Sequence, residues 1–147
     1  MPQIQELLQQ RDWLLADGAT GTNYFDMGLQ AGDAPELWNT DHVDRVADLH
    51  RRFISAGADI VLTNTFGGTR YRLQLHGAQD RVTELNDAAA AIAREEADRA
   101  DHPVVVAGSI GPTGEIMLSM CFGWRRCPPK RKCVPPDRPQ QRRDFRL

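Results

Sequence analysis

An acidic residue between a short apolar run and a pair of glycines is the feature of this sequence best suited to bind a small ligand. The apolar residues 13–16 are too short and continuous for an amphipathic helix and predict a buried strand. Asp17 follows them, Gly18 comes directly after it, and Gly21 comes three residues later. A carboxylate accepts hydrogen bonds from an ammonium group, and glycines bring bare backbone N–H groups close to a ligand carboxylate. The segment therefore suits a zwitterion. A plain turn, in which Asp17 and Thr20 satisfy local backbone groups, is the alternative.

The same pattern occurs twice more along the chain. Apolar residues 58–62 lead into residues 63–68, which carry hydroxyl, amide and glycine residues, and residues 104–107 lead into residues 108–114 in the same way. Helical patterns fill the gaps between the three apolar runs. This order predicts a β-α-β-α-β unit of the α/β class with a parallel sheet. Ligands of such sheets bind at the carboxyl ends of the strands, so the three polar segments are expected to converge.

Two amphipathic helices connect the predicted strands. The first is expected to begin at Thr40 or Asp41, since either can cap it, and to end at Gly57. The second is expected over residues 81–99. Each carries an apolar stripe at spacings of three and four residues, which predicts that one side packs on the sheet.

Shorter segments lie around these helices. Residues 1–12 predict a short helix without a targeting signal, and residues 69–76 predict a short helical insertion. Residues 23–39 are expected to be a long connection that can fold over a site. Tyr24 and Trp38 lie in this connection, and packing is favoured for them over contact with a ligand.

The composition divides the chain near Met117. Of 18 basic and 20 acidic residues, residues 118–147 hold nine and two, so the rest of the chain holds 18 − 9 = 9 and 20 − 2 = 18. We expect residues 118–147 to be a separate, irregular basic tail, translated out of frame and disordered. A basic arm that binds nucleic acid non-specifically is one alternative. A zinc site is the other, although the tail cysteines, Cys121, Cys127 and Cys133, lack a C-x-x-C pair.

Several functions find no support in the sequence. No G-x-G-x-x-G follows a strand, and residues 108–114 lack the Lys-Ser/Thr of a phosphate-binding loop. No run is long and apolar enough to span a membrane. We therefore expect a cytoplasmic protein that binds neither membrane nor, in its main body, nucleic acid or nucleotides.

Three segments resemble the homocysteine S-methyltransferases. They are Asp-Gly-Ala-Thr-Gly-Thr at residues 17–22, Ala-Gly-Ala-Asp-Ile-Val-Leu-Thr-Asn-Thr-Phe at residues 56–66, and Ala-Gly-Ser-Ile-Gly-Pro-Thr-Gly at residues 107–114. Their order and spacing match the family, and the residues within them are similar to those of bacterial betaine–homocysteine methyltransferases. The resemblance covers roughly residues 13–117. It implies that residues 1–117 are the N-terminal part of a TIM (β/α)8 barrel.

The resemblance also implies a site. Homocysteine and a zinc ion bind at the carboxyl ends of the strands in this family, and the metal lowers the thiol pKa so that the thiolate attacks a methyl donor. The implied substrate-binding residues of this chain are Asp17, Gly18, Thr20, Asn64, Thr65 and Ser109. The zinc-binding cysteines of the family lie on later strands, in motifs that this sequence lacks. We therefore assign no catalytic residue and no metal ligand.

The sequence leads to one hypothesis and one alternative. The hypothesis is a homocysteine S-methyltransferase that makes methionine, truncated here, inactive alone and without bound zinc. Betaine, S-methylmethionine and methyltetrahydrofolate are all open as methyl donors, because the aromatic residues that surround betaine in animal members are replaced by Asp33, Ala34 and Gly67. The alternative is a small non-catalytic binding protein with a basic nucleic-acid-binding arm.

Overall fold

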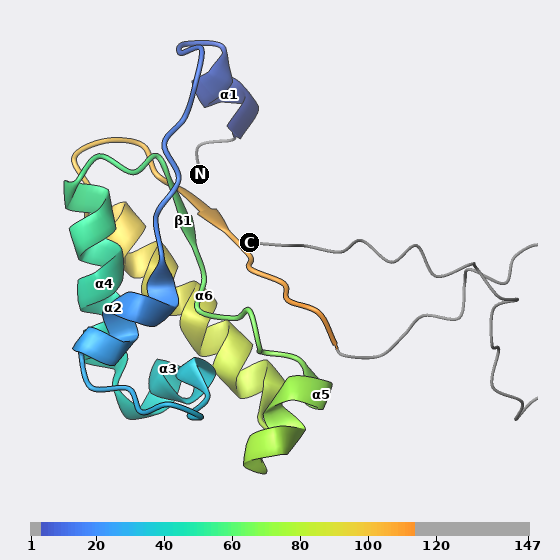
Figure 1. The fold of residues 1–147 in the computed structure, drawn as a ribbon. Coiled ribbons are helices and arrows are strands. Elements are labelled where there is room, and N and C mark those ends of the chain that lie inside the picture. Colours follow the sequence, from blue (N-terminus) through green and yellow to red (C-terminus); the bar gives the residue numbers. More distant parts are fainter. Residues whose placement is uncertain (1–3, 114–147) are drawn as a thin grey trace, which may run out of the picture. The chain divides into compact units, whose positions relative to one another are not determined.

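The structure, a computed structural model, describes residues 4–113 of the 147-residue chain. Helices alternate with short strands in this part, as Figure 1 shows. In chain order the elements are α1 (Ile4–Leu8), α2 (Thr20–Asp26), η1 (Pro35–Leu37), α3 (Trp38–Asp41), α4 (Val43–Ser55), β1 (Ile60–Leu62), α5 (Arg70–Leu73), η2 (Gln74–His76), α6 (Val82–Asp98) and β2 (Val105–Ala107). The predicted α/β class is confirmed for these residues, whereas the predicted tail and its boundary at Met117 lie outside them.

A small parallel sheet forms the centre of the described part. β1 and β2 pair in parallel, with Ile60 opposite Val105 and Leu62 opposite Ala107. One parallel bridge joins Ala16 to Ile60 on the other side of β1. The order across the sheet is therefore residue 16, β1 and β2. The carboxyl ends of all three segments lie along the same edge, as the sequence pattern predicts.

The predicted first strand is shorter and more exposed than expected. Only Ala16 pairs with β1, and the side chains of Trp13 and Leu15 are 70% and 46% exposed. The backbone N–H groups of Asp59 and Ile60 donate to the carbonyl of Leu15 and hold the segment on one side. On its other side no strand lies within residues 4–113. The prediction of a buried strand over residues 13–16 is wrong for this reason.

Helices α4 and α6 pack together and cover one face of the sheet. Val61 in β1 is fully buried and clusters with Ile54 of α4 and Ala97 of α6. The next residue, Leu62, faces the other way and is 39% exposed. Because side chains alternate along a strand, one face of β1 is apolar core and the other is open. Burial of a side chain such as Val61 or Ile54 stabilises the fold by about 1.5–3 kcal/mol.

A second apolar cluster explains a helix that the sequence pattern did not predict. Helix α2 lies in the segment expected to be glycine-rich loop and connection, and it buries Tyr24 completely. The Tyr24 ring lies 5.4 Å from the Trp38 ring of α3. The buried residues of this cluster are Tyr24, Leu29, Trp38, Val46, Leu49 and Ile92. The expectation of a connection without helix from residue 23 is corrected here, because tertiary packing of Tyr24 stabilises a short helix.

The predicted crossover helices differ from the structure mainly at their start. Helix α3 ends before His42, whose φ of −142° and ψ of 52° break the helical path, and α4 begins at Val43. The hydroxyl of Thr40 donates to the carbonyl of Leu37. A start of the long helix at Thr40 or Asp41 is therefore wrong. Its end is confirmed, since Gly57 has a φ of +97° just after the helix.

The other helical predictions are confirmed. Helix α6 lies inside the predicted range 81–99. The predicted insertion at residues 69–76 contains α5 and η2, and the hydroxyl of Thr69 accepts a hydrogen bond from the N–H of Arg72. Helix α1 lies within residues 1–12, as expected. None of the helices in residues 4–113 combines the length and the apolar character that crossing a bilayer requires.

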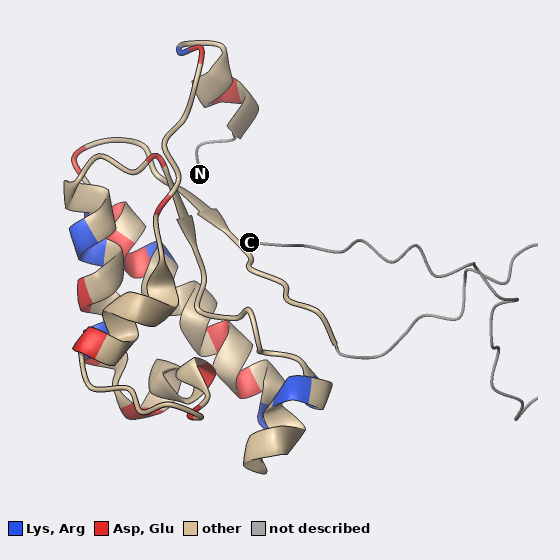
Figure 2. Cartoon of the chain, viewed as in Figure 1, with Lys and Arg blue, Asp and Glu red and all other residues tan. Residues whose placement is uncertain are grey.

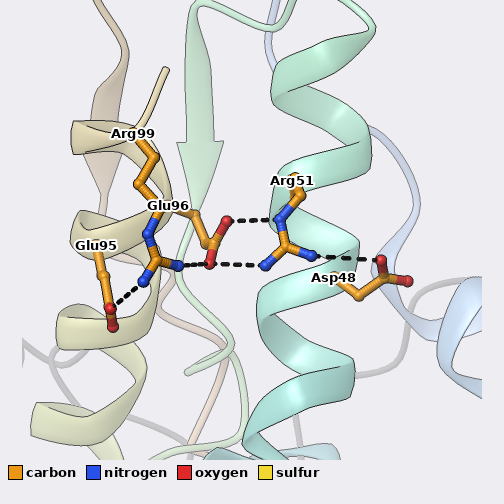
Figure 3. A network of polar contacts seen from close by, with 5 residues as sticks. All are labelled: Asp48, Arg51, Glu95, Glu96 and Arg99. Atoms are coloured by element: carbon orange, nitrogen blue, oxygen red, sulfur yellow. Dashed lines mark hydrogen bonds and ion pairs between the residues drawn. The ribbon is translucent and has the colours of Figure 1, made fainter.

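Charged residues join α4 and α6 on the side away from the sheet. Figure 2 shows residues of both signs along these helices, and Figure 3 shows the network that they form. Glu96 of α6 is only 3% exposed and accepts two hydrogen bonds from Arg51 of α4, both at 3.0 Å. Arg99 also forms ion pairs with Glu96 and Glu95. Oδ1 of Asp48 lies 3.9 Å from Nη1 of Arg51. The buried carboxylate of Glu96 therefore has two cationic partners, of which Arg51 joins α4 to α6 and Arg99 lies at the end of α6 itself.

Candidate functional site

A cavity of about 420 Å³ opens at the carboxyl ends of the strands. This volume lies in the range of small-molecule sites, about 300–1,000 Å³. The predicted residues Thr20, Asn64 and Ser109 line it, and so do Leu62 at the end of β1 and Tyr24 of α2. The structure therefore brings together residues from all three polar strand ends.

Asp17 does not itself line this cavity but contacts Leu62, which does, and it uses only one of its two oxygens. Its Oδ2 accepts a hydrogen bond of 2.9 Å from the backbone N–H of Leu62. Its Oδ1 is buried and has no hydrogen-bond partner within residues 4–113. Burial raises the pKa of Asp17, and the hydrogen bond from Leu62 opposes this shift. The arrangement holds a carboxylate in place and leaves one oxygen without a donor.

Gly18 makes room for a neighbouring side chain and does not adopt a special backbone conformation. A Cβ atom at Gly18 would lie 3.1 Å from Cε1 of Phe53. Gly21 lies in α2 and has no such neighbour within 4 Å. The glycines with positive φ in residues 4–113 are Gly28, Gly32, Gly57 and Gly77. The close approach expected at Gly18 is thus to the Phe53 ring, and neither Gly18 nor Gly21 uses a left-handed conformation.

Asn64 joins two parts of the cavity wall. Its Nδ2 donates to the carbonyl of Pro35 at 2.8 Å and to Oδ1 of Asn39 at 2.9 Å. In return, Nδ2 of Asn39 donates to the carbonyls of Asn64 and Leu85. Both donor hydrogens of the Asn64 amide are occupied within the protein. Asn64 therefore shapes the cavity by holding the segment before α3 against the end of β1.

Hydroxyl groups connect the ends of β1 and β2. The Thr65 hydroxyl donates to the carbonyl of Ser109 at 2.7 Å, so its single hydrogen is used. Thr63 Oγ1 lies 2.7 Å from Thr65 Oγ1 and must donate to it, while accepting from the N–H of Ser109. Thr65 borders a neighbouring hollow rather than the main cavity, and Ser109 borders both. Sequence reasoning did not single out Thr63, although it belongs to the same polar strand end.

Glu36 is a cavity residue that sequence reasoning missed. It is 5% exposed, and its Oε1 accepts a hydrogen bond of 2.6 Å from the N–H of Gly67. A Cβ at Gly67 would lie 2.8 Å from the same oxygen. The glycine is thus required for the approach of Glu36. The Pro-Glu pair after Ala34 was the available signal, but the contact joins segments 31 residues apart.

The cavity wall carries charges of both signs. Asp33 and Glu36 supply carboxylates, and Arg72 of α5 and His76 of η2 supply basic groups. Figure 2 shows the basic residues of α5, the helix that contributes Arg72 to the cavity wall. A ligand with both an ammonium and a carboxylate group would find complementary charges here.

Comparison with known proteins identifies the family. The homocysteine S-methyltransferase family model matches residues 14–133 of the chain. The chain belongs to this family. The match continues past Met117, the predicted end of the barrel portion, as far as Cys133. That boundary lies outside the described residues and stays a prediction.

Relatives and solved structures agree with the family. The chain is 37% identical over 118 residues to methionine synthase of Mycobacterium leprae (strain TN), and 35% identical to that of Mycobacterium tuberculosis (strain ATCC 25618 / H37Rv); each comparison covers 74% of the chain. Among solved structures it is similar to the homocysteine methyltransferase MmuM from Escherichia coli. The comparison with the oxidized form gives 26% identity and covers 76% of the chain, and that with the metallated form gives 25% identity and covers 82% of the chain. The TM-score is 0.63 for both.

The chain spans a small part of these relatives. It covers 10% of each methionine synthase and 41% and 44% of the two MmuM chains. This member of the homocysteine S-methyltransferase family therefore matches less than half the length of each of these relatives.

A metal site of the kind implied by the family does not fit the described residues. Zinc in proteins is held by three or four Cys, His or carboxylate ligands. Within residues 4–113, no three such side chains gather where they could share an ion. The cysteines at positions 121, 127 and 133 lie outside these residues. The expectation that the chain does not bind zinc stays a prediction.

Proposed function

We propose that this chain is the homocysteine-binding N-terminal part of a TIM-barrel homocysteine S-methyltransferase. Asp17 Oδ1 would accept from the ammonium of homocysteine, and the backbone around Gly18 would lie toward its carboxylate. Thr20, Asn64, Thr65 and Ser109 would line or support the same site. The observation that carries the proposal is the Asp17 carboxylate, held by Leu62 at one oxygen and left without a donor at the other.

The complete enzyme would transfer a methyl group from betaine or a similar donor, S-methylmethionine or methyltetrahydrofolate, to the homocysteine thiol. Zinc would supply thiolate activation in that enzyme. A thiol with a pKa of about 8.5 is only a few per cent ionised at neutral pH without such help. The described residues provide binding and orientation. We therefore propose that the 147-residue chain binds homocysteine without producing methionine.

Isothermal titration of the 147-residue chain with L-homocysteine under reducing conditions tests the binding. We expect binding that Asp17→Asn weakens about tenfold or more, because a hydrogen bond to a charged group contributes about 1.5–3 kcal/mol. Asp26→Asn is the matched control, since Asp26 is an exposed aspartate at the end of α2, whereas Oδ1 of Asp17 is buried and has no donor within residues 4–113. Absence of binding, or equal affinity of the Asp17→Asn variant, would contradict the proposal.

A second measurement tests turnover. The chain is incubated with homocysteine, zinc and each of the three donors, and methionine is quantified by mass spectrometry. We expect none above the level without protein. Zinc-dependent methionine formation would show that sulfur activation resides in this chain after all.

A further inference from the structure

Tyr24 carries a buried polar atom at the cavity that has no partner within residues 4–113. Its side chain is fully buried and lines the cavity, yet its hydroxyl has no hydrogen-bond partner within residues 4–113. Buried hydroxyls are normally paired, so an unpaired one on a cavity wall requires an explanation. The ring itself is accounted for by its packing against Trp38. The oxygen is not.

The surroundings of this hydroxyl are acidic. Burial raises the pKa of Tyr24, and the negative charges of Glu36 and Asp17 raise it further. The phenol therefore keeps its proton at all physiological pH values. The lone pairs of Oη accept from no group within residues 4–113 and are available to a cationic donor.

An ammonium group needs more than one acceptor. It has three N–H donors, and Asp17 Oδ1 can satisfy one of them. Tyr24 lies in α2, the next element after Asp17, and its side chain lines the cavity together with Leu62, whose N–H donates to Asp17. From these observations we infer that Tyr24 is a further substrate-binding residue, whose hydroxyl accepts from the ligand ammonium held by Asp17. The inference rests on the proposed function and deepens it, because it selects ligands with a free α-ammonium group.

The test uses a pair of ligands and a pair of tyrosines. L-Homocysteine and 4-mercaptobutanoate, which lacks the amino group, are titrated into the 147-residue chain and into its Tyr24→Phe variant. Phenylalanine keeps the ring that packs on Trp38 and removes only the oxygen. Tyr71→Phe is the matched control, because the Tyr71 side chain is 52% exposed on α5 and does not line the cavity.

Tyr24→Phe is expected to weaken homocysteine binding about tenfold, while its affinity for 4-mercaptobutanoate stays equal to that of the unchanged chain. The double variant with Asp17→Asn should lose less than the product of the two single losses, since both residues contact one group. Urea unfolding of Tyr24→Phe should show a midpoint no lower than that of the unchanged chain. A purely structural role would lower this midpoint and weaken both ligands alike.

The outcomes separate this inference from the proposed function. If the unchanged chain binds homocysteine and Asp17→Asn weakens it, but Tyr24→Phe does not, the Tyr24 inference is wrong and the proposed function stands. An equal loss of affinity for both ligands in Tyr24→Phe would also overturn the inference. If the unchanged chain does not bind homocysteine, both are wrong.

Discussion

The carboxylate of Asp17 accepts a hydrogen bond from the backbone N–H of Leu62, with 2.9 Å between Oδ2 and N. The two residues are 45 positions apart, and the bond joins the end of the first strand segment to the last residue of β1. The backbone N–H of Asp17 also donates to the carbonyl of Ile60. Asp17 is thus fixed from both its backbone and its side chain, and its remaining oxygen, Oδ1, has no donor within residues 4–113.

This arrangement predicts a pH-dependent stability difference for Asp17→Asn. Burial raises the pKa of Asp17 in the folded chain above its value of about 3.9 in the unfolded chain. Its contribution to stability is therefore complete below pH 4 and is lost as the pH rises through the raised pKa. We expect the free energy of unfolding of the unchanged chain, relative to the variant, to decrease from about pH 3 to pH 7.

Urea unfolding at a series of pH values measures this difference. Asp26→Asn serves as the control for loss of a charge at an exposed position. An increase in the relative stability of the unchanged chain with rising pH would contradict the sign of the shift.

The interlocked amides of Asn39 and Asn64 predict a large loss of stability for Asn64→Ala. The substitution removes donors to Pro35 and Asn39 and leaves buried acceptors unpaired. We expect a destabilisation of about 2 kcal/mol in urea unfolding. Asn23→Ala is the control, because Asn23 makes one exposed hydrogen bond to the Ala19 carbonyl and should change stability less. An equal effect of the two substitutions would show that the amide pair does not stabilise the cavity wall.

The sequence predicts those features of the fold that depend on residue spacing and residue type within one segment. The apolar stripes of α4 and α6 and the left-handed Gly57 follow from spacing and residue type, and the structure contains them. Tyr24 and Glu36 could not be predicted in this way. Tyr24 is buried by Trp38 of a later helix, and Glu36 meets Gly67 only because the chain returns to the same edge of the sheet. Contacts between distant segments decide which polar residues face the cavity.

The Arg51–Glu96–Arg99 network predicts non-additive effects. Arg51 and Arg99 are each more than half exposed, whereas Glu96 is 3% exposed. Loss of one arginine leaves Glu96 a second cation, so Arg51→Ala and Arg99→Ala alone should each have a small effect. Loss of both leaves a buried carboxylate without a partner, which is strongly unfavourable.

A double-mutant cycle followed by urea unfolding tests this prediction. We expect the double variant to lose clearly more stability than the sum of the two single variants. Arg52→Ala provides the control, since Arg52 pairs only with the partly exposed Asp48 among the ion pairs of residues 4–113. Simple additivity at Arg51 and Arg99 would mean that Glu96 does not depend on either cation.

The two edges of the sheet predict self-association. No strand within residues 4–113 covers the outer side of residue 16 or of β2, and unpaired strand edges are templates for pairing between chains. Large apolar side chains lie close to both edges, since Trp13 is 70% and Ile110 is 87% exposed. We expect the chain to form concentration-dependent oligomers in sedimentation velocity, and Trp13→Lys with Ile110→Lys to reduce them, because charges at an edge oppose pairing. Leu75→Lys is the matched control: Leu75 is 71% exposed but lies in η2, away from the strands. If Leu75→Lys reduced association as much as the edge substitutions, general surface hydrophobicity rather than the open edges would drive it.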